Sequence, residues 1–91
     1  MIRSFRDSET EKIFKGIMSR KFQAIERIAL RKLFQLQAAK SLHDLRSPGA
    51  ALEALKDSRT GQHSIRINDQ YRLCFVWKNG DAYDVEVTDY H

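Results

Sequence analysis

The sequence ends in Asp89, Tyr90 and His91, which place an acid, a phenol and an imidazole in consecutive positions. These three side-chain types can accept or donate protons in catalysis. They directly follow residues 82–88, whose alternating pattern is typical of a strand. If this strand pairs within a sheet, the three side chains are held in fixed positions, and the end of the chain predicts proton-transfer chemistry. A polar surface tail is the alternative interpretation.

Two turn signals predict which residues lie opposite one another in the preceding strands. Asn79-Gly80 is typical of a type I′ hairpin, and a two-residue loop there pairs Lys78 with Asp81. Counted outward from this turn, the predicted pairs on one face are Val76 with Tyr83, Cys74 with Val85 and Arg72 with Val87, followed by Asp89 and His91.

A three-residue loop at 68–70 pairs Arg66 with Arg72 in the next hairpin. Two arginines directly opposed repel each other, so an anion is expected near them. Asp89 is one candidate for this anion. A bound phosphate is the other, because an arginine can bind two phosphate oxygens at once.

Two helices are expected before these strands, after a short strand at residues 1–5. Ser8 and Glu11 predict a capping box at the start of the first helix, which ends near Ile17. Apolar residues at helical spacing predict the second helix: Phe22, Ile25, Ala29, Leu33 and Leu36, with Leu30 and Phe34 widening the stripe. Residues 50–56 are either a strand or one helical turn. The expected fold is α+β, with an N-terminal strand, two helices and a C-terminal antiparallel β-meander.

The composition predicts one folded domain of residues 1–91, since 42% of residues are hydrophobic and only one is proline. No apolar stretch approaches the ~20 residues of a membrane span, and the first residues lack the apolar core of a signal peptide. Cys74 is the only cysteine, so it has no partner for an internal disulfide. A cytoplasmic protein without membrane contact is expected. No histidine or cysteine pair has metal-ligand spacing, so neither a metal site nor a cofactor is predicted.

Positive charge is concentrated in the first half of the chain. Residues 1–46 contain 11 Lys or Arg and 5 Asp or Glu, a net charge of +6, whereas residues 47–91 contain 5 and 7, a net charge of −2. This asymmetry favours a polyanionic partner such as nucleic acid. Arg27 and Arg31 lie on one face of the second predicted helix and are candidate RNA contacts; a merely solvated helix face is the alternative.

Residues 61–75, Gly-Gln-His-Ser-Ile-Arg-Ile-Asn-Asp-Gln-Tyr-Arg-Leu-Cys-Phe, resemble the central signature of the HigB-type toxins. These toxins, also called plasmid maintenance system killer proteins, belong to the RelE superfamily. The opening residues 1–5, the Asn79-Gly80 turn and the closing residues 89–91 resemble the same family in the same order. The resemblance therefore covers nearly the whole chain and implies a small α+β fold with two helices packed on a curved sheet.

The resemblance also implies a function, namely the toxin of a bacterial type II toxin–antitoxin system. Such toxins enter the ribosomal A site and cut mRNA there without a metal ion. The implied partners are the ribosome, mRNA and a HigA-type helix-turn-helix antitoxin, with operator DNA bound only through the toxin–antitoxin complex.

The family's site residues carry over position by position. Arg72 matches the sheet arginine that contacts the scissile phosphate, Tyr90 and His91 match the terminal pair at the cleavage site, and Asp89 precedes them as in the family. Lys56 matches a lysine of the short central segment. Three positions earlier, some members carry a catalytic histidine where this chain has Glu53. The general base is therefore either Glu53 or His91. Arg59 and Arg66, in or beside the signature, are candidate phosphate contacts.

The residues suit this chemistry independently of the resemblance. Attack of an RNA 2′-OH on the adjacent phosphate needs a base, positive charge at the phosphoryl oxygens and an acid for the leaving oxygen. Arg72 and Lys56 would supply the charge, and Tyr90 would position or stack on a base. The replacement of histidine by Glu53 keeps a second reading open, in which the chain is a non-catalytic module that binds RNA, the ribosome or an antitoxin.

Overall fold

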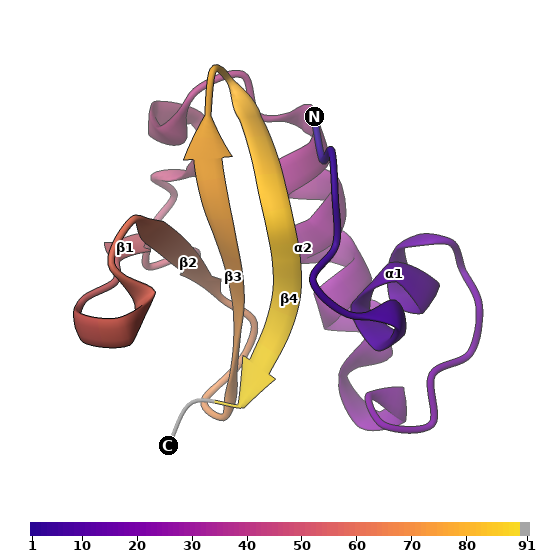
Figure 1. Cartoon of the computed structure of the whole chain (residues 1–91). Helices are drawn as coiled ribbons and strands as arrows, with labels where there is room; N and C mark the ends of the chain where they lie inside the picture. The colour runs from indigo at the N-terminus through magenta and orange to yellow at the C-terminus, as the bar shows by residue number, and fades with distance from the viewer. Residues whose placement is uncertain (90–91) are drawn as a thin grey trace.

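The computed structural model describes residues 1–89 as two α-helices and a four-stranded antiparallel sheet with the strand order β1-β2-β3-β4 (Figure 1). The α+β prediction and the C-terminal meander are confirmed. Tyr90 and His91 lie outside the described residues. The elements are α1 (Ser8–Phe14), α2 (Glu26–Ala38), β1 (Glu53–Ala54), β2 (Gln62–Arg66), β3 (Tyr71–Lys78) and β4 (Asp81–Asp89), with 3₁₀ turns at Gln23–Ile25, Leu42–Leu45 and Asp57–Arg59.

Helix α1 begins one residue earlier and ends sooner than the sequence predicts. The N-cap is Asp7, whose carboxylate accepts a hydrogen bond from the backbone N–H of Thr10. The predicted capping box at Ser8 is therefore wrong. The helix stops at Phe14 because Gly16 adopts a φ of +74°, the left-handed conformation that commonly follows a helix.

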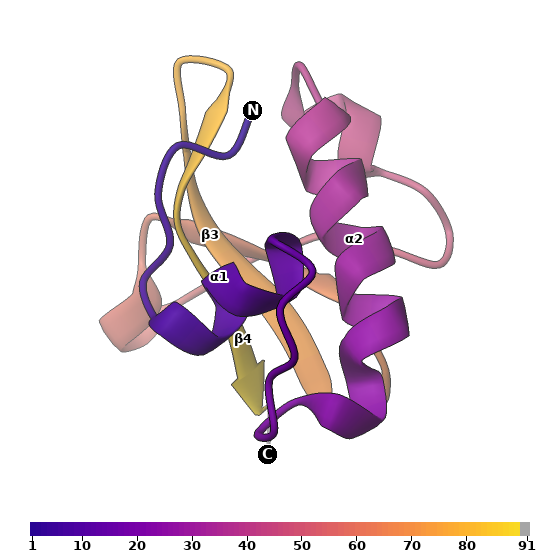
Figure 2. The same ribbon diagram turned by 90° about the vertical axis from the view of Figure 1, so that its right-hand side faces the viewer.

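Helix α2 lies against one face of the sheet, as Figure 2 shows, and its apolar stripe joins the core. Ala29, Leu33 and Leu36 are fully buried and join β-strand residues in one core. Phe34 departs from the prediction, because 55% of its surface is exposed and its ring meets Phe14 edge-on at 5.9 Å. Among residues 1–89, no helix is long and apolar enough to cross a membrane.

The first residues of the chain lie along β4 but form two isolated bridges in place of the predicted strand. Ile2 pairs with Ala82 and Phe5 with Val85, both in the parallel sense. Asp81 anchors this segment through Arg3 at 3.1 Å and the N-terminal amine at 3.3 Å. Hydrogen bonding to Arg3 and to the N-terminal amine lowers the pKa of Asp81 below its usual value.

Both predicted turns of the meander are confirmed. Asn79 and Gly80 have φ values of +53° and +81°, as a type I′ turn requires, and Lys78 pairs with Asp81. In the other hairpin, Arg66 pairs with Arg72. Residues 50–56 contribute the short edge strand β1, so the strand alternative holds for Glu53–Ala54.

A β-bulge in β4 overturns the predicted register beyond the turn. Val76 pairs with Tyr83 as predicted, but Cys74 then pairs with Glu86 and Arg72 with Thr88, not with Val85 and Val87. Asp84 takes the left-handed conformation at φ +51°, and its N–H donates to Ser4 Oγ at 2.9 Å. The extra residue turns Val85 and Val87 into the core, so Glu86 and Thr88 share the face of Arg72 instead. Asp89, which was also predicted on that face, pairs with Tyr71.

Candidate active site

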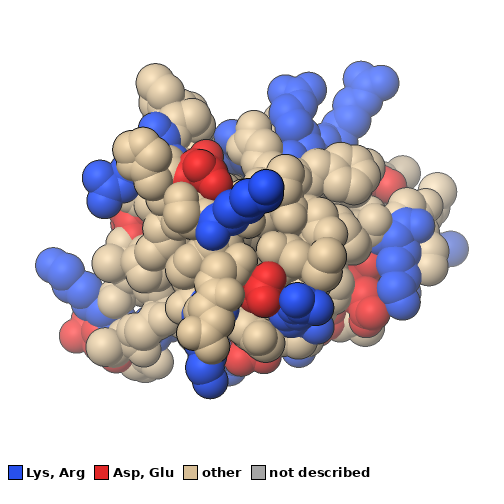
Figure 3. Space-filling view, turned by 90° about the horizontal axis from the view of Figure 1, so that it is seen from above, with Lys and Arg blue, Asp and Glu red and all other residues tan. Residues whose placement is uncertain are grey.

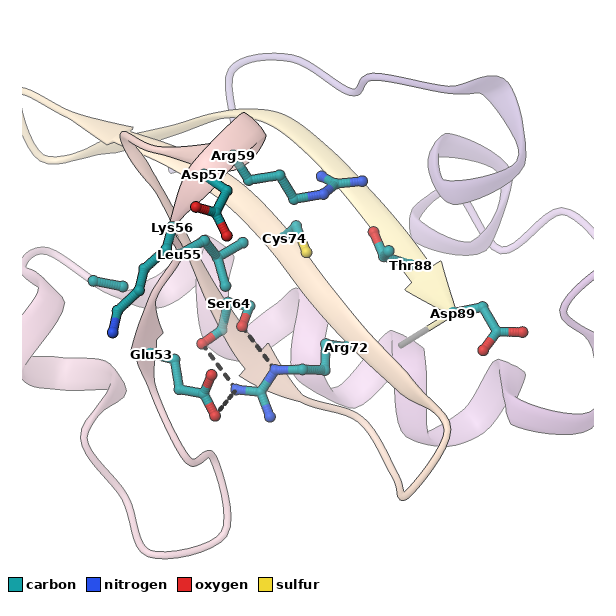
Figure 4. A pocket seen from close by; sticks show the side chains of 11 residues that line it. Glu53, Leu55, Lys56, Asp57, Arg59, Ser64, Arg72, Cys74, Thr88 and Asp89 are labelled. Atoms are coloured by element: carbon teal, nitrogen blue, oxygen red, sulfur yellow. Dashed lines mark hydrogen bonds and ion pairs between the residues drawn. The ribbon is translucent and has the colours of Figure 1, made fainter. Parts of the chain in front are cut away.

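A cavity of about 630 Å³ opens on the sheet face that the helices leave uncovered (Figure 4). Alternation along β2 and β3 produces two different faces, because Ile65, Leu73 and Phe75 enter the core while Ser64 and Arg72 face the cavity. The remaining lining residues are Glu53, Ala54, Leu55, Lys56, Asp57, Arg59, Cys74, Thr88 and Asp89.

Arg72 is firmly held at this cavity. Its Nε donates to Ser64 Oγ at 2.7 Å, and one terminal nitrogen donates to the carbonyls of Ala51 at 2.5 Å and Ser64 at 3.3 Å. Only 11% of the Arg72 side chain is exposed. Because the guanidinium is planar, these contacts fix its orientation, and a phosphate that binds it meets donors already in place.

The carbonyl that Arg72 reaches belongs to a residue in a costly backbone conformation. Ala51 has a φ of +45°, which costs an alanine roughly 1–2 kcal/mol. The backbone on both sides is tied down, since Ala50 O accepts from Arg66 N at 2.7 Å and Glu53 pairs with Ser64. The loop before β1 therefore serves to direct one carbonyl toward the arginine.

Glu53 lies beside Arg72 and remains accessible. Its Oε1 is 3.8 Å from a terminal nitrogen of Arg72, and 53% of its side chain is exposed. Figure 4 shows the carboxylate reaching the guanidinium from β1. A carboxylate in this position can take a proton from a group bound at Arg72, so the geometry keeps Glu53 as a candidate general base.

Arg59 reaches the cavity from the 3₁₀ turn that follows β1, of which it is the last residue. It donates to Glu86 Oε1 at 2.7 Å and to Gln62 Oε1 at 3.1 Å. Glu86 also lies 3.9 Å from Arg6, so one carboxylate of β4 faces two arginines. This carboxylate orients Arg59 across the sheet toward the cavity.

Among residues 1–89, the charges of the side chains that line the cavity balance. Lys56, Arg59 and Arg72 are matched in number by Glu53, Asp57 and Asp89. Asp89 stands at the end of β4, where it accepts from Gln70 Nε2 at 3.1 Å. Balanced charge favours a ligand that is held by directed contacts over one drawn in by net attraction alone.

The structure thus brings five of the predicted site residues together and leaves three described ones elsewhere. Arg66 pairs with Asp69 and does not line the cavity, although it lies directly opposite Arg72. Arg27 and Arg31 are on α2, on the other side of the sheet. Asp89, the last residue of β4, lines the cavity. The predicted catalytic residues Tyr90 and His91 follow it in the sequence and lie outside the described residues.

The basic side chains do not merge into one patch at the end of the molecule seen in Figure 3. Lys and Arg project at separate places there, with acidic side chains between them. Among residues 1–89, no group of three or more His, Cys, Asp and Glu side chains is arranged to hold a metal ion.

Sequence reasoning missed Ser64, the hydroxyl that orients Arg72, and Thr88, which lies directly opposite Arg72. Ser64 could have been found, because the predicted loop at 68–70 already places it opposite Cys74 on the face of Arg72. Thr88 could not, because the bulge at Asp84 reverses its face.

Comparison with known proteins gives consistent matches over the whole chain. A family model described as the RelE-like toxin of the type II toxin–antitoxin system HigB matches residues 3–91. Toxin HigB-1 of Vibrio cholerae is 38% identical over 85 residues, which cover 90% of each chain. Endoribonuclease HigB of Proteus vulgaris is 34% identical over 93 residues, which cover 100% of each chain.

Solved structures show the same fold at lower identity. In the YoeB–YefM complex from Staphylococcus aureus, the matched chain superposes with a TM-score of 0.63 at 20% identity, over 100% of this chain and 98% of that one. The YoeB dimer from the same organism gives a TM-score of 0.62 over 99% and 97%.

Proposed function

This chain belongs to the HigB family of RelE-like toxins of type II toxin–antitoxin systems, and we propose that it is a ribosome-dependent endoribonuclease that cuts mRNA in the A site. The observation that carries the proposal is Arg72, nearly buried at an open cavity and oriented by one hydroxyl and two carbonyls. The endoribonuclease named among its relatives supports the reaction class.

In the proposed reaction, the 2′-oxygen of one nucleotide attacks the phosphate that joins it to the next. A base takes the 2′-OH proton, a bond forms between the 2′-oxygen and phosphorus, and the bond from phosphorus to the 5′-oxygen breaks. An acid returns a proton to that leaving oxygen. Negative charge grows on the phosphoryl oxygens during attack, and Arg72 stabilises this charge with help from Lys56 and Arg59.

Glu53 is the proposed base and His91 the proposed acid. Glu53 is already within ion-pair reach of the arginine that would hold the reacting phosphate, and it remains half exposed to an incoming ribose. His91 follows Asp89, which lines the same cavity. Tyr90 would position or stack on a base. No step of the proposed reaction is assigned to a metal ion.

The balanced charge of the described residues that line the cavity supports the proposed ribosome dependence. With three cations matched by three carboxylates, the cavity has little net attraction for free RNA. Substrate positioning by the ribosome would supply what the toxin lacks. Arg66, Arg27 and Arg31, which lie outside the cavity, would contact RNA away from the reacting phosphate. We expect weak or no cleavage of naked RNA.

The proposed protein partner is a HigA-type helix-turn-helix antitoxin, and the pair would bind operator DNA together. Membership of a toxin–antitoxin family supports a partner of this class. A toxin whose substrate is mRNA on ribosomes would act in the cytoplasm.

The test is mRNA cleavage on ribosomes programmed with a defined A-site codon, compared with the same mRNA alone. We expect cuts within the A-site codon of the ribosome-bound mRNA, and little cleavage of the free mRNA. If the folded protein binds ribosomes but leaves the mRNA intact, the non-catalytic binding module becomes the better description.

A further inference from the structure

A second cavity, of about 580 Å³, lies next to the candidate active site. Ala54 of the edge strand β1 lines both cavities. Successive residues of the neighbouring strand β2 point to opposite faces of the sheet, so Ser64 lines the first cavity and His63 lines the second. The two cavities therefore lie on opposite faces of one sheet edge, separated by β1.

His63 lines the second cavity, and its ring is held in place. Its imidazole stacks on the buried ring of Phe75, with centroids 6.3 Å apart and planes inclined by 23°. Nδ1 is buried and has no hydrogen-bond partner within residues 1–89. Nε2 is thus the nitrogen that remains to meet a ligand, on a ring whose position is fixed by Phe75.

The other walls are partly apolar, and Ser47 and a cation also line the cavity. Leu42, Pro48 and Leu52 line the cavity, and Arg46 lies at an exposed position beside them. Apolar walls suit the flat faces of a nucleobase, the imidazole nitrogen suits its polar edge, and the guanidinium suits a phosphate.

We propose that the second cavity is a nucleotide subsite, which holds a base of the same RNA strand whose phosphate occupies the Arg72 cavity. This inference deepens the proposed function and rests on it. Ala54 lines both cavities, so only the short edge strand β1 separates them. This favours RNA over a protein ligand, since one RNA strand can reach both cavities across β1. Unstacked bases of single-stranded RNA can be placed on different protein surfaces.

The experiment is an NMR titration of the full chain with AMP, GMP, CMP and UMP in parallel with ribose 5-phosphate. The signals followed are the ring C–H resonances of His63 and the backbone amides of Leu52 and Ala54. We expect at least one nucleotide to shift them, and ribose 5-phosphate to leave the His63 ring unmoved.

Two variants test the assignment to His63. His63→Phe retains a ring against Phe75 and removes the nitrogen, so nucleotide affinity falls about fivefold, as expected for one lost hydrogen bond. Lys78→Ala, an exposed cation at the β3–β4 turn, is the matched control and leaves the affinity unchanged.

The inference would be overturned by nucleotide shifts confined to the Arg72 cavity, by equal His63 shifts with ribose 5-phosphate, or by unchanged affinity in His63→Phe. A response of these signals to an antitoxin but to no nucleotide would assign the cavity to a protein and also overturn it. The titration contains no ribosome, so nucleotide binding by a protein that cuts nothing would support the subsite while refuting the proposed cleavage.

Discussion

Ser64→Ala tests whether the orientation of Arg72, and not only its charge, drives the proposed reaction. The Ser64 hydroxyl accepts from Arg72 Nε at 2.7 Å, and Ser64 is fully buried. A hydrogen bond to a charged group contributes about 1.5–3 kcal/mol. If this orientation is needed only in the transition state, the variant loses roughly 10- to 150-fold in kcat, at about 1.4 kcal/mol for each factor of ten.

The lower end of this range is expected. Two carbonyl contacts to Arg72 survive the substitution, so the guanidinium stays in the cavity with greater rotational freedom. The assay is single-turnover cleavage of mRNA on programmed ribosomes, with the Arg72 Nε–H signal followed by NMR. Ser58→Ala, at an exposed position beside the cavity, is the control. Cleavage by Ser64→Ala within twofold of wild type, with the Nε–H signal altered, would refute the reasoning.

Three further predictions follow from the geometry. Glu53→Gln should lower the cleavage rate by about 10²–10⁴-fold, whereas Glu53→His should restore part of that rate. Glu53→His should also move the acidic limb of the pH–rate profile to higher pH, because an imidazole holds its proton to higher pH than a carboxylate. Equal cleavage rates in Glu53→Gln and wild type would exclude Glu53 as the base. Asp81→Asn should destabilise the fold at neutral pH, and the difference from wild type should vanish in acid. The sign follows from the lowered pKa of Asp81, because the stabilisation that the ionised carboxylate gives the fold is present above its unfolded-state pKa and is lost as the pH falls through its folded-state pKa. Urea unfolding at several pH values measures the difference in the free energy of unfolding. A difference that does not change with pH would contradict the prediction. Leu33→Ala, at a fully buried position of α2, should lower the free energy of unfolding by about 2–5 kcal/mol, and a loss below 1 kcal/mol would contradict its place in the core.

Local chemistry was sufficient to predict the two turns of the meander and most of the main helix, although Phe22 and Ile25 lie before α2. Asn79-Gly80 supplies the two positive φ angles of its turn, and the apolar spacing of α2 identifies Ala29, Leu33 and Leu36 as core. Through the loop at 68–70, the sequence also predicted that Arg66 and Arg72 are opposed, which the structure confirms.

The bulge in β4 could not be predicted in this way, because it depends on residues far apart in the sequence. Ser4, 80 positions away, accepts from the N–H of Asp84 and fixes the extra residue. Burial of Val85 and Val87 then determines the register. Counting residue pairs outward from the Asn79-Gly80 turn takes neither the hydrogen bond to Ser4 nor this burial into account. The count therefore placed the two valines on the face of Arg72.

In the candidate site, too, some features were predicted from the sequence and others required the structure. The positions of Arg72, Glu53, Lys56, Arg59 and Asp89 at one cavity agree with the residues chosen from the sequence. The groups that orient Arg72 were not foreseen, because one is a carbonyl of Ala51 in a left-handed conformation and no side-chain pattern reports it. Sequence thus identified the charged groups, while the backbone that orients them required the structure.

The most direct test of the central claim is cleavage of mRNA on programmed ribosomes by Arg72→Lys. Lysine keeps the positive charge but loses the planar fork that Ser64 and Ala51 orient. We predict that Arg72→Lys, like Arg72→Ala and a deletion of residues 90–91, loses nearly all cleavage while remaining folded, and that Lys78→Ala cuts at the wild-type rate. Cleavage by Arg72→Lys at close to the wild-type rate would contradict the claim that an oriented guanidinium at this cavity carries the reaction.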